Sequence, residues 1–261
     1  MLLCPVRDCH LPLTRDKGRV VCPRGHSFDI ARDGHINLLQ PQDRRSKEPG
    51  DTRDAVAARR RLHDLSVTRP LLDAMAALID ARASDVVLDA GCGDGFYLGS
   101  LARETGVEAH GVDISLPAVN AAARRYKEGE WIVANADRFI PYADQSFSVV
   151  MSITGRMNGA EFRRVLRDGG RLLVAVAAPD DLKELRSRTG ADGRDRVDRT
   201  VETFAPAFKL IERRRATTVA DLNAAAVHDV LVSIYRPMRS EPLEGMRVTF
   251  SLDLLLFRAD G

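Results

Sequence analysis

Apolar and polar positions follow one another in a regular order between residues 85 and 178. Short apolar runs such as Val86–Leu88 and Trp131–Ala134 have the length of buried strands, and segments with helical spacing lie between them. The other strands predicted in this region are Glu108–Val112, Phe147–Ser152 and Arg171–Ala177. Strands that alternate with helices predict an α/β fold built on a doubly wound sheet.

Local signals predict where several helices of this region begin. A helix is expected to open at Phe96 or at the residue after it, and Ser115 can cap the next one, over residues 118–126. Residues 160–166 are also predicted to be helical, and Asp168–Gly170 to form a turn before the following strand.

The pattern weakens beyond residue 185. Arg186–Arg199 is polar and rich in Arg, Asp and Gly, which predicts a flexible loop. A dense apolar run at Leu252–Phe257 lies inside a predicted final strand, Arg247–Phe257. We expect that strand to close the edge of the sheet.

The first 26 residues contain a cluster of metal-ligand side chains. Cys4 and Cys9 form one pair, and Cys22 with His26 forms a second. Four sulfur and nitrogen ligands in two pairs suit tetrahedral zinc, and so short a segment has too little apolar mass to fold without a cross-link. The first pair is spaced more widely than usual, and His10 is a competing ligand. The alternative is a set of unrelated free thiols beside a surface histidine.

Turn and capping residues organise the rest of the N-terminal third. Lys17-Gly18 predicts a hairpin turn before a short strand, and Gly25 allows the bend that lets Cys22 and His26 reach one ion. Residues 40–51 have the composition of a linker. The helix predicted after them, Arg53–Asp64, can be capped by Asp51 or Thr52.

Charge is distributed unevenly along the chain. The net charge of the whole chain is only +2, but residues 1–67 carry 13 lysines and arginines against 9 acidic residues. A basic N-terminal third is typical of a segment that binds a polyanion. A solvated surface whose charges are unevenly distributed by chance explains the asymmetry equally well. The same two interpretations apply to Arg59–Arg61, which circle the predicted helix. No apolar run of about 18 residues and no signal peptide occur, which predicts a cytoplasmic protein with no membrane partner.

A glycine-rich turn follows the first strand of the α/β region. The strand leads through Asp89 into Gly91, Gly93 and Gly95, and a helix opens directly afterwards. Glycines at such a turn let a ligand lie against the backbone. About twenty residues later a second strand ends at Asp113, where a carboxylate can accept hydrogen bonds from both ribose hydroxyls of a nucleoside.

The third strand ends in Asn135-Ala136-Asp137, whose polar side chains suit an adenine edge. A dinucleotide-binding dehydrogenase is the nearest structural alternative. Its fingerprint, Gly-x-Gly-x-x-Gly, has two residues between the second and the third glycine. Here the pair Gly91 and Gly93 is followed by the third glycine after only one residue.

Residues 85–178, from the glycine-rich turn through "LRDGGRLLVAV", resemble the class I S-adenosylmethionine-dependent methyltransferases. The resemblance implies a seven-stranded Rossmann-like domain with a direct methyl transfer to a nucleophile. It also implies a set of cofactor-binding residues: Asp89, Gly91, Cys92, Gly93, Asp94, Gly95, Asp113, Asn135, Ala136 and Asp137. Cys92 is more typical of packing inside the loop than of chemistry, and Asp144 of a turn.

A narrower resemblance joins the two halves of the chain. "CPVRDC", "VVCPRGHSFDIARDGHINLL" and "RRSKEPGDTRDAVAARRRL" are similar to the 23S ribosomal RNA guanine-N1 methyltransferases, which carry an N-terminal zinc module. The resemblance implies zinc on the four N-terminal ligands, a ribosomal RNA hairpin as substrate, and two protomers that together form the RNA-binding cleft. We divide the chain accordingly into a zinc-binding module (1–40), a linker with a helical segment (41–84) and a methyltransferase domain (85–261).

The chain departs from that family at two places. Ser66-Val67-Thr68 stands where a Gly-His-Tyr segment usually contacts the cofactor, and Ile153–Arg156 replaces an Ile-Tyr-Ala-Pro segment near the target base. Two alternatives therefore stay open: a methyltransferase for another RNA or a small molecule, and a non-catalytic RNA-binding protein.

The sequence assigns no catalytic base. Three candidates stand near the predicted site by position alone, and for each a turn or cap role is the alternative: Asp137, Asp180 and Asp181. His35 and His63 look like ordinary polar residues.

Overall fold

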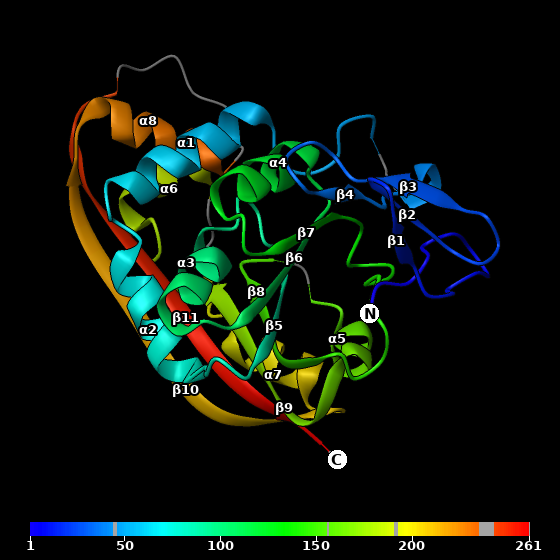
Figure 1. The fold of residues 1–261 in the computed structure, drawn as a ribbon. Helices are drawn as coiled ribbons and strands as arrows, with labels where there is room; N and C mark the ends of the chain where they lie inside the picture. The colour runs from blue at the N-terminus through cyan, green and yellow to red at the C-terminus, as the bar shows by residue number, and fades with distance from the viewer. Residues whose placement is uncertain (44–45, 156, 191–192, 235–242, 261) are drawn as a thin grey trace.

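The computed structural model describes residues 1–43, 46–155, 157–190, 193–234 and 243–260. One large sheet forms the centre of the molecule (Figure 1). Its eight strands are β4 (Ile36–Asn37), β5 (Val86–Ala90), β6 (Glu108–Asp113), β7 (Glu130–Val133), β8 (Phe147–Ile153), β9 (Leu166–Ala177), β10 (Phe208–Leu222) and β11 (Met246–Ala259). Their order across the sheet is β10-β11-β9-β8-β5-β6-β7-β4. The predicted α/β class is confirmed, with β4 added to the seven strands of the body.

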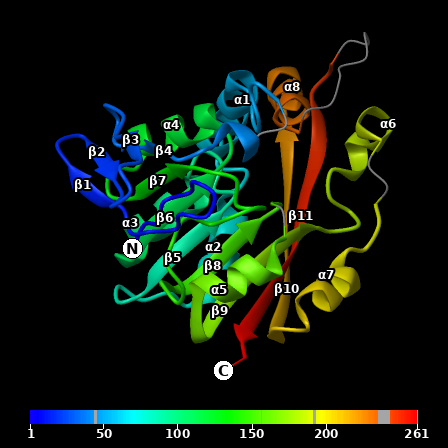
Figure 2. The same ribbon diagram turned by 90° about the vertical axis from the view of Figure 1, so that its right-hand side faces the viewer.

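Helices cover both faces of this sheet (Figures 1 and 2). Apolar side chains of α2 (Arg69–Ile79), α3 (Phe96–Thr105) and α4 (Leu116–Arg125) pack on one face. Those of α5 (Gly159–Val165) and α7 (Val197–Phe204) pack on the other. A third apolar cluster joins α1 (Arg53–Asp64) to α8 (Ala224–Ser233). No helix within the described part of the chain is long and apolar enough to cross a membrane.

The topology gathers loops at one edge of the sheet. From β4 across to β9 every neighbouring pair of strands is parallel, so their carboxyl ends lie at the same edge. The chain builds β5, β6 and β7 in one direction and then returns to place β8 on the other side of β5. Ligands of doubly wound sheets bind at such a reversal of strand order, outside the carboxyl ends of the strands.

The C-terminal strands differ from the prediction. β11 does not close the sheet, because it pairs antiparallel with β9 on one side and with β10 on the other. β10 is the edge strand, and its residues carry no clear strand signal because they are mostly exposed or half-buried. A strand with so little burial lacks the apolar run that marks a central strand.

Two segments predicted to be irregular lie partly within strands or helices. Asp168–Gly170 belongs to β9, where the pairing with β8 shifts register and Gly169 has a φ of +68°. The expectation of a loop over Arg186–Arg199 is wrong at the two ends of the segment, which are helical, while residues 193–196 have no regular structure. The segment η2 (Lys183–Leu185) leads into α6 (Arg186–Thr189), and α7 begins at Val197; residues 191–192 lie outside the described residues.

The N-terminal module has a small antiparallel sheet of its own. It contains β1 (Thr14–Asp16), β2 (Arg19–Val21) and β3 (Ser27–Asp29). The predicted turn at Lys17-Gly18 joins the first two strands, and both residues have positive φ, as a type I′ hairpin requires.

The module is packed onto the body at the end of the large sheet opposite β10. β4 pairs with β7, and the backbone N–H of Leu38 donates to the carbonyl of Val133 at 2.9 Å. Ile36 and Leu38 are buried in the same apolar cluster as the body. Arg15 forms a 2.6 Å ion pair with Glu130 across the junction.

Candidate active site and metal centre

The glycine-rich loop (residues 89–95) joins β5 to α3 at the reversal of strand order. Gly91 and Gly93 have φ values of +95° and +54°, a region that side-chain-bearing residues rarely adopt. The backbone N–H groups of Gly91 and Cys92 donate to the carbonyl of Val112 at 2.8 and 3.1 Å. The loop is therefore held against the end of β6.

Hydrogen bonds to Asp113 connect the glycine-rich loop with the loop that follows β6. The Oδ2 of Asp113 accepts from the backbone N–H of Gly93 at 2.9 Å, and its Oδ1 accepts from that of Ser115 at 2.8 Å. Burial raises the pKa of Asp113, while the two backbone N–H groups act in the opposite direction. Ser115 also caps α4 as predicted, because its hydroxyl accepts from the backbone N–H of Ala118.

A cavity of about 1120 Å³ opens beside the glycine-rich loop. Its walls come from the loops after β5 to β9 and from α1, α8, β10 and β11. Single ligand sites usually measure about 300–1000 Å³, so this cavity has room for more than one small ligand. Nine predicted cofactor-binding residues line it: Asp89, Gly91, Cys92, Gly93, Asp94, Asp113, Asn135, Ala136 and Asp137.

Gly95, the tenth predicted residue, is not among the described residues that line the cavity. Its φ is +75°, and a Cβ built on it would lie 2.7 Å from the Trp131 ring and 2.8 Å from the Ala122 side chain. The structure thus requires glycine here for the packing of α3 against its neighbours. Cys92 is buried in the same apolar cluster as Trp131.

Asp89 is the first residue of the glycine-rich loop and has little contact with solvent. Its side chain is almost fully buried, and its Oδ1 has no hydrogen-bond partner among the described residues. Burial, together with the nearby charge of Asp113, raises the pKa of Asp89 to about 8. A buried carboxylate oxygen without a partner is costly unless a ligand supplies a donor.

The segment predicted to be a linker forms part of the cavity wall. Ser46, Pro49, Gly50 and Asp51 all line the cavity, and the Ser115 hydroxyl donates to the Asp51 carbonyl at 2.7 Å. Gly50 has a φ of +80°, and a Cβ there would lie 2.8 Å from the Ser115 Cβ. Thr52, the other candidate, caps the following helix α1.

His63 is a cavity residue that sequence reasoning missed. It is buried on α1, and its Nδ1 lies 2.7 Å from the Thr68 hydroxyl. Its Nε2 has no hydrogen-bond partner among the described residues; the nearest carboxylate oxygen, on Asp94, is 3.8 Å away. Burial and the charges of Arg59 and Arg125 lower the pKa of His63 to about 3, so the ring is neutral.

The divergent loop after β8 also reaches the cavity. Ile153, Thr154 and Gly155 line it, whereas Arg156 lies outside the described residues. Thr154 has a φ of +50°, which is unusual for a β-branched residue and costs on the order of 1–3 kcal/mol. Its backbone N–H donates to the Ala175 carbonyl at 2.9 Å, which holds it in this conformation.

The three candidate bases lie in different surroundings. Asp137 lines the cavity, and its backbone N–H donates to the Asn135 side chain at 3.0 Å in a turn. Asp180 is not among the lining residues. Asp181 lines the cavity, and its Oδ1 accepts from the backbone N–H of Ser251 at 2.8 Å.

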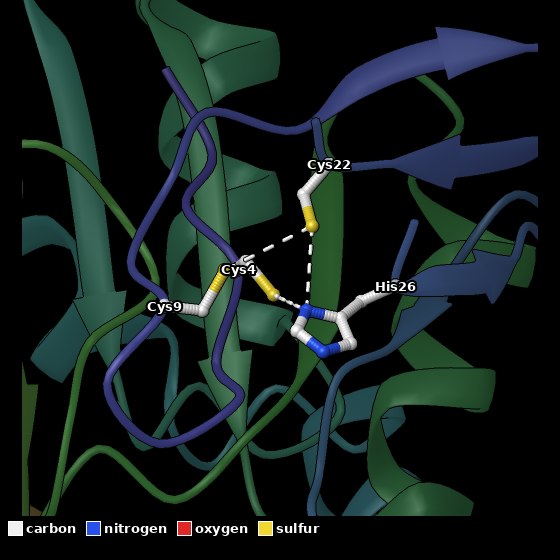
Figure 3. A group of neighbouring side chains, drawn as sticks. All are labelled: Cys4, Cys9, Cys22 and His26. Carbon is white, nitrogen blue, oxygen red and sulfur yellow. Dashed lines mark hydrogen bonds between the residues drawn. The ribbon is translucent and has the colours of Figure 1, made fainter. Parts of the chain in front are cut away.

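The four predicted metal ligands come together in the N-terminal module. Figure 3 shows their side chains pointing toward one another from the two turns. The Nδ1 of His26 lies 3.4 Å from the Cys4 sulfur and 3.3 Å from the Cys22 sulfur, and the sulfurs of Cys9 and Cys22 are 3.8 Å apart. All four atoms lie within 4.8 Å of one another.

These distances fit a tetrahedral metal. Bonds of about 2.1–2.3 Å at tetrahedral angles separate neighbouring sulfur and nitrogen ligands by roughly 3.4–3.8 Å. Gly25 has a φ of +84°, so the predicted bend before His26 is present. His10 is not in the cluster: its ring is stacked on Phe139, with centroids 4.3 Å apart.

Two protein families match parts of the chain. A zinc-ribbon family described as "RlmA, N-terminal" matches residues 2–47. A family described as "Methyltransferase domain" matches residues 87–173. The two matches cover the metal cluster and the glycine-rich loop.

Similar proteins extend the comparison to most of the chain. The 23S rRNA (guanine(748)-N(1))-methyltransferase of Streptomyces fradiae is 35% identical, over 88% of this chain and 81% of its own length. The putative 23S rRNA (guanine-N(1)-)-methyltransferase YxjB of Bacillus subtilis is 30% identical, over 98% of this chain and 96% of its own. A putative methyltransferase structure from Bacillus halodurans shares the fold, with a TM-score of 0.54 at 15% identity; the alignment covers 73% of this chain and 99% of that structure.

Proposed function

The chain belongs to the S-adenosylmethionine-dependent 23S rRNA (guanine-N1)-methyltransferases, and we propose that it methylates N1 of a guanine in a 23S ribosomal RNA hairpin. The observation that carries this proposal is the juxtaposition of two sites on one continuous sheet. A cavity lined by the glycine-rich loop opens in the body, and a four-ligand metal module is packed onto the same sheet.

The residues of the cavity suit S-adenosylmethionine. The unpartnered Oδ1 of Asp89 would accept a hydrogen bond from the cofactor's ammonium group, and Asp113 would hold the ribose hydroxyls. Asn135–Asp137 would border the adenine. When bound, the cofactor supplies an electrophilic methyl group on a sulfonium. The task of the protein is then chiefly to align the acceptor nitrogen with that group at near-attack distance.

Zinc would be held by Cys4, Cys9, Cys22 and His26. Four protein ligands complete a tetrahedral shell and leave no open position for a substrate, which is the pattern of a structural site. Its contribution would be to fold the module, because the metal-binding free energy of such a segment is folding free energy.

A guanine inside paired RNA cannot reach a cavity of this kind unless it leaves the base stack. We therefore expect the target base to be flipped out or already unpaired, and the basic N-terminal third to contact the phosphates around it. The family resemblance further implies that two copies of the chain form the RNA-binding cleft. Analytical ultracentrifugation tests this: a monomer in the presence of RNA would contradict it. Since ribosomal RNA is the substrate, we assign the enzyme to the cytoplasm.

Methyl transfer from labelled S-adenosylmethionine tests the assignment. The purified protein should label unmodified 23S rRNA, and 16S rRNA serves as the matched control. Labelling of 16S rRNA alone, or of small molecules from a cell extract but not RNA, would favour the alternative substrates. Cofactor binding without any methyl transfer would favour a non-catalytic RNA-binding protein.

A further inference from the structure

The cavity has a part beyond the glycine-rich loop that cofactor binding does not explain. Its wall there comes from β10, β11 and α8, and it combines apolar side chains with the hydroxyl-bearing residues Thr218, Ser233 and Ser251. We call this part the acceptor lobe and define it by Ala216, Val230, Phe250, Leu252 and the carboxylate of Asp181. Apolar side chains with a small number of polar groups among them suit a flat heteroaromatic ring that must be held in one orientation.

The backbone places Asp181 firmly at this position. It follows β9, which is separated from β5 by β8 alone, so Asp181 lies at the same edge of the sheet as the glycine-rich loop. Its backbone N–H donates to the Ala178 carbonyl at 3.0 Å, and its Oδ1 accepts from the Ser251 backbone N–H at 2.8 Å. Its Oδ2 makes no hydrogen bond or ion pair with the described residues. One carboxylate oxygen is thus anchored and the other is available to a ligand.

The other carboxylates in the cavity wall have different partners or positions. Both oxygens of Asp113 accept backbone N–H groups. Asp43 pairs with Arg138 at 3.3 Å, and Asp51 pairs with Arg59. The remaining three belong to the glycine-rich loop or to the predicted adenine edge: Asp89, Asp94 and Asp137. Among the carboxylates of the described cavity wall, Asp181 is therefore the one that faces the acceptor lobe.

We propose that Asp181 is a catalytic residue that removes the N1 proton of the target guanine; this inference rests on the proposed function. As the N1 lone pair forms the new nitrogen–carbon bond, the methyl carbon–sulfur bond breaks with its electrons remaining on sulfur. The N1–H bond breaks as well: its electron pair stays on N1, and its proton moves to the Oδ2 of Asp181. That proton then passes to solvent through the open cavity.

The surroundings of Asp181 are compatible with this role. Burial raises its pKa to about 6, and the charge of Asp180 acts in the same direction. The Ser251 backbone N–H and the charges of Arg196 and Arg186 lower it. Burial, and to a smaller extent the charge of Asp181, raises the pKa of Tyr97 on α3, so that phenol stays protonated. A base with a pKa near 6 is ionised at neutral pH and still basic enough to accept a proton in the transition state. The rate should therefore rise with pH through about 6 and level off above it.

The chain offers a matched control for a purely structural role. Glu184, three residues further on, also accepts hydrogen bonds from β11: the Thr249 backbone N–H donates at 2.9 Å and the Thr249 hydroxyl at 2.6 Å. Glu184 is not among the residues that line the cavity. Asp181→Asn and Glu184→Gln therefore disturb the same anchoring of this segment, but only the first removes a base from the acceptor lobe.

Single-turnover methylation of 23S rRNA, measured from pH 5 to 9, distinguishes the two roles. Asp181→Asn should lower the rate by about 10²–10⁴-fold and abolish the inflection near pH 6, with calorimetric affinity for S-adenosylmethionine unchanged. Glu184→Gln should stay within about twofold of the wild type. Asp181→Glu, which keeps a carboxylate, should recover part of the rate. Equal rates for Asp181→Asn and Glu184→Gln would overturn the assignment.

A second measurement does not depend on activity. In a carboxyl-carbon NMR titration of the whole protein, the signal missing from Asp181→Asn should titrate near pH 6 in the wild type. Titration near pH 4 would contradict the proposed base. The two proposals fail in different ways. If wild-type protein methylates 23S rRNA while Asp181→Asn is equally active, only the role of Asp181 is overturned; if the wild type leaves 23S rRNA unmodified, the proposed function and the role of Asp181 are both overturned.

Discussion

The imidazole ring of His63 lies flat against the ring of Phe96, with centroids 3.8 Å apart and planes 3° apart. Phe96 is the first residue of α3, directly after the glycine-rich loop, and His63 is near the end of α1. The stacked pair therefore connects the helix that follows the predicted linker to the loop that lines the cavity. A protonated histidine would be costly in this buried position.

We predict that His63 makes folding sensitive to mild acid. Its pKa is about 3 in the folded protein and about 6.5 in the unfolded chain, so below pH 6.5 the unfolded chain binds a proton that the folded protein does not. Stability contributed by the neutral ring is complete above pH 6.5 and is lost as pH falls. The difference should reach about 2 kcal/mol between pH 7 and pH 5. Urea unfolding of wild type and His63→Phe checks it: the variant should lose less stability over this range, and parallel curves would contradict the assignment.

Asp113→Ala should weaken binding of S-adenosylmethionine. We propose that the carboxylate holds the ribose; it also accepts hydrogen bonds from the backbone N–H groups of Gly93 and Ser115. Hydrogen bonds to a charged group contribute about 1.5–3 kcal/mol, so the dissociation constant should rise roughly tenfold to a hundredfold. Titration calorimetry measures it, with Asp144→Ala as the control because Asp144 is exposed and pairs with Arg164 outside the cavity. Equal affinities for both variants would show that Asp113 does not hold the cofactor.

Metal analysis should find close to one zinc per chain in protein purified without chelator. Cys22→Ala removes one of the four ligands and should lose the metal, together with the fold of the N-terminal module. Cys92→Ala is the matched control, since Cys92 is buried in the body away from the cluster and should leave the zinc content unchanged. A well-folded wild-type module free of metal would contradict the assignment.

The basic segment after the module should contribute to RNA binding. Replacing Arg44, Arg45 and Lys47 with Ala should weaken RNA affinity and reduce its salt dependence, by about one unit of slope for each lost phosphate contact. Lys47 is exposed, whereas Arg44 and Arg45 lie outside the described residues. Filter binding at several salt concentrations measures the slope. An unchanged slope would mean that this segment is only a solvated surface.

Deletion of residues 1–40 is a poorer test of the same idea. It would remove β4 from the edge of the large sheet and take Ile36 and Leu38 out of the shared apolar core. Loss of such buried side chains costs about 2–5 kcal/mol each, so a truncated protein would report on stability as well as on RNA binding. A charge substitution at an exposed residue such as Lys47 leaves the core intact.

The parts of the fold that could be predicted are those with local signals. The strand, glycine-rich loop and helix over Val86–Thr105 depend on an apolar run and on glycines at positive φ. The metal cluster likewise follows from two ligand pairs with a turn between them. The cap at Ser115 needs only its own side chain and the next turn of backbone.

The parts that could not be predicted depend on contacts between distant segments. Nothing in the residues around His63 indicates that its ring will stack on that of Phe96. The segment at Gly50 has a linker composition, and only its approach to Ser115 makes it part of the cavity. β10 is stabilised by its long pairing with β11, which a half-exposed edge strand does not reveal in its own sequence.

The central claim is that this cavity delivers a methyl group to N1 of a guanine in 23S rRNA. Methylation at N1 blocks Watson–Crick pairing, so reverse transcription stops at the modified nucleotide. Unmodified 23S rRNA should be incubated with the wild-type protein and S-adenosylmethionine, with Asp113→Ala as the control, and the stops mapped along the RNA. The account predicts one new stop at a guanine in a hairpin, strongly reduced with the variant at limiting cofactor. No new stop in 23S rRNA, despite full cofactor binding by the wild type, would contradict it.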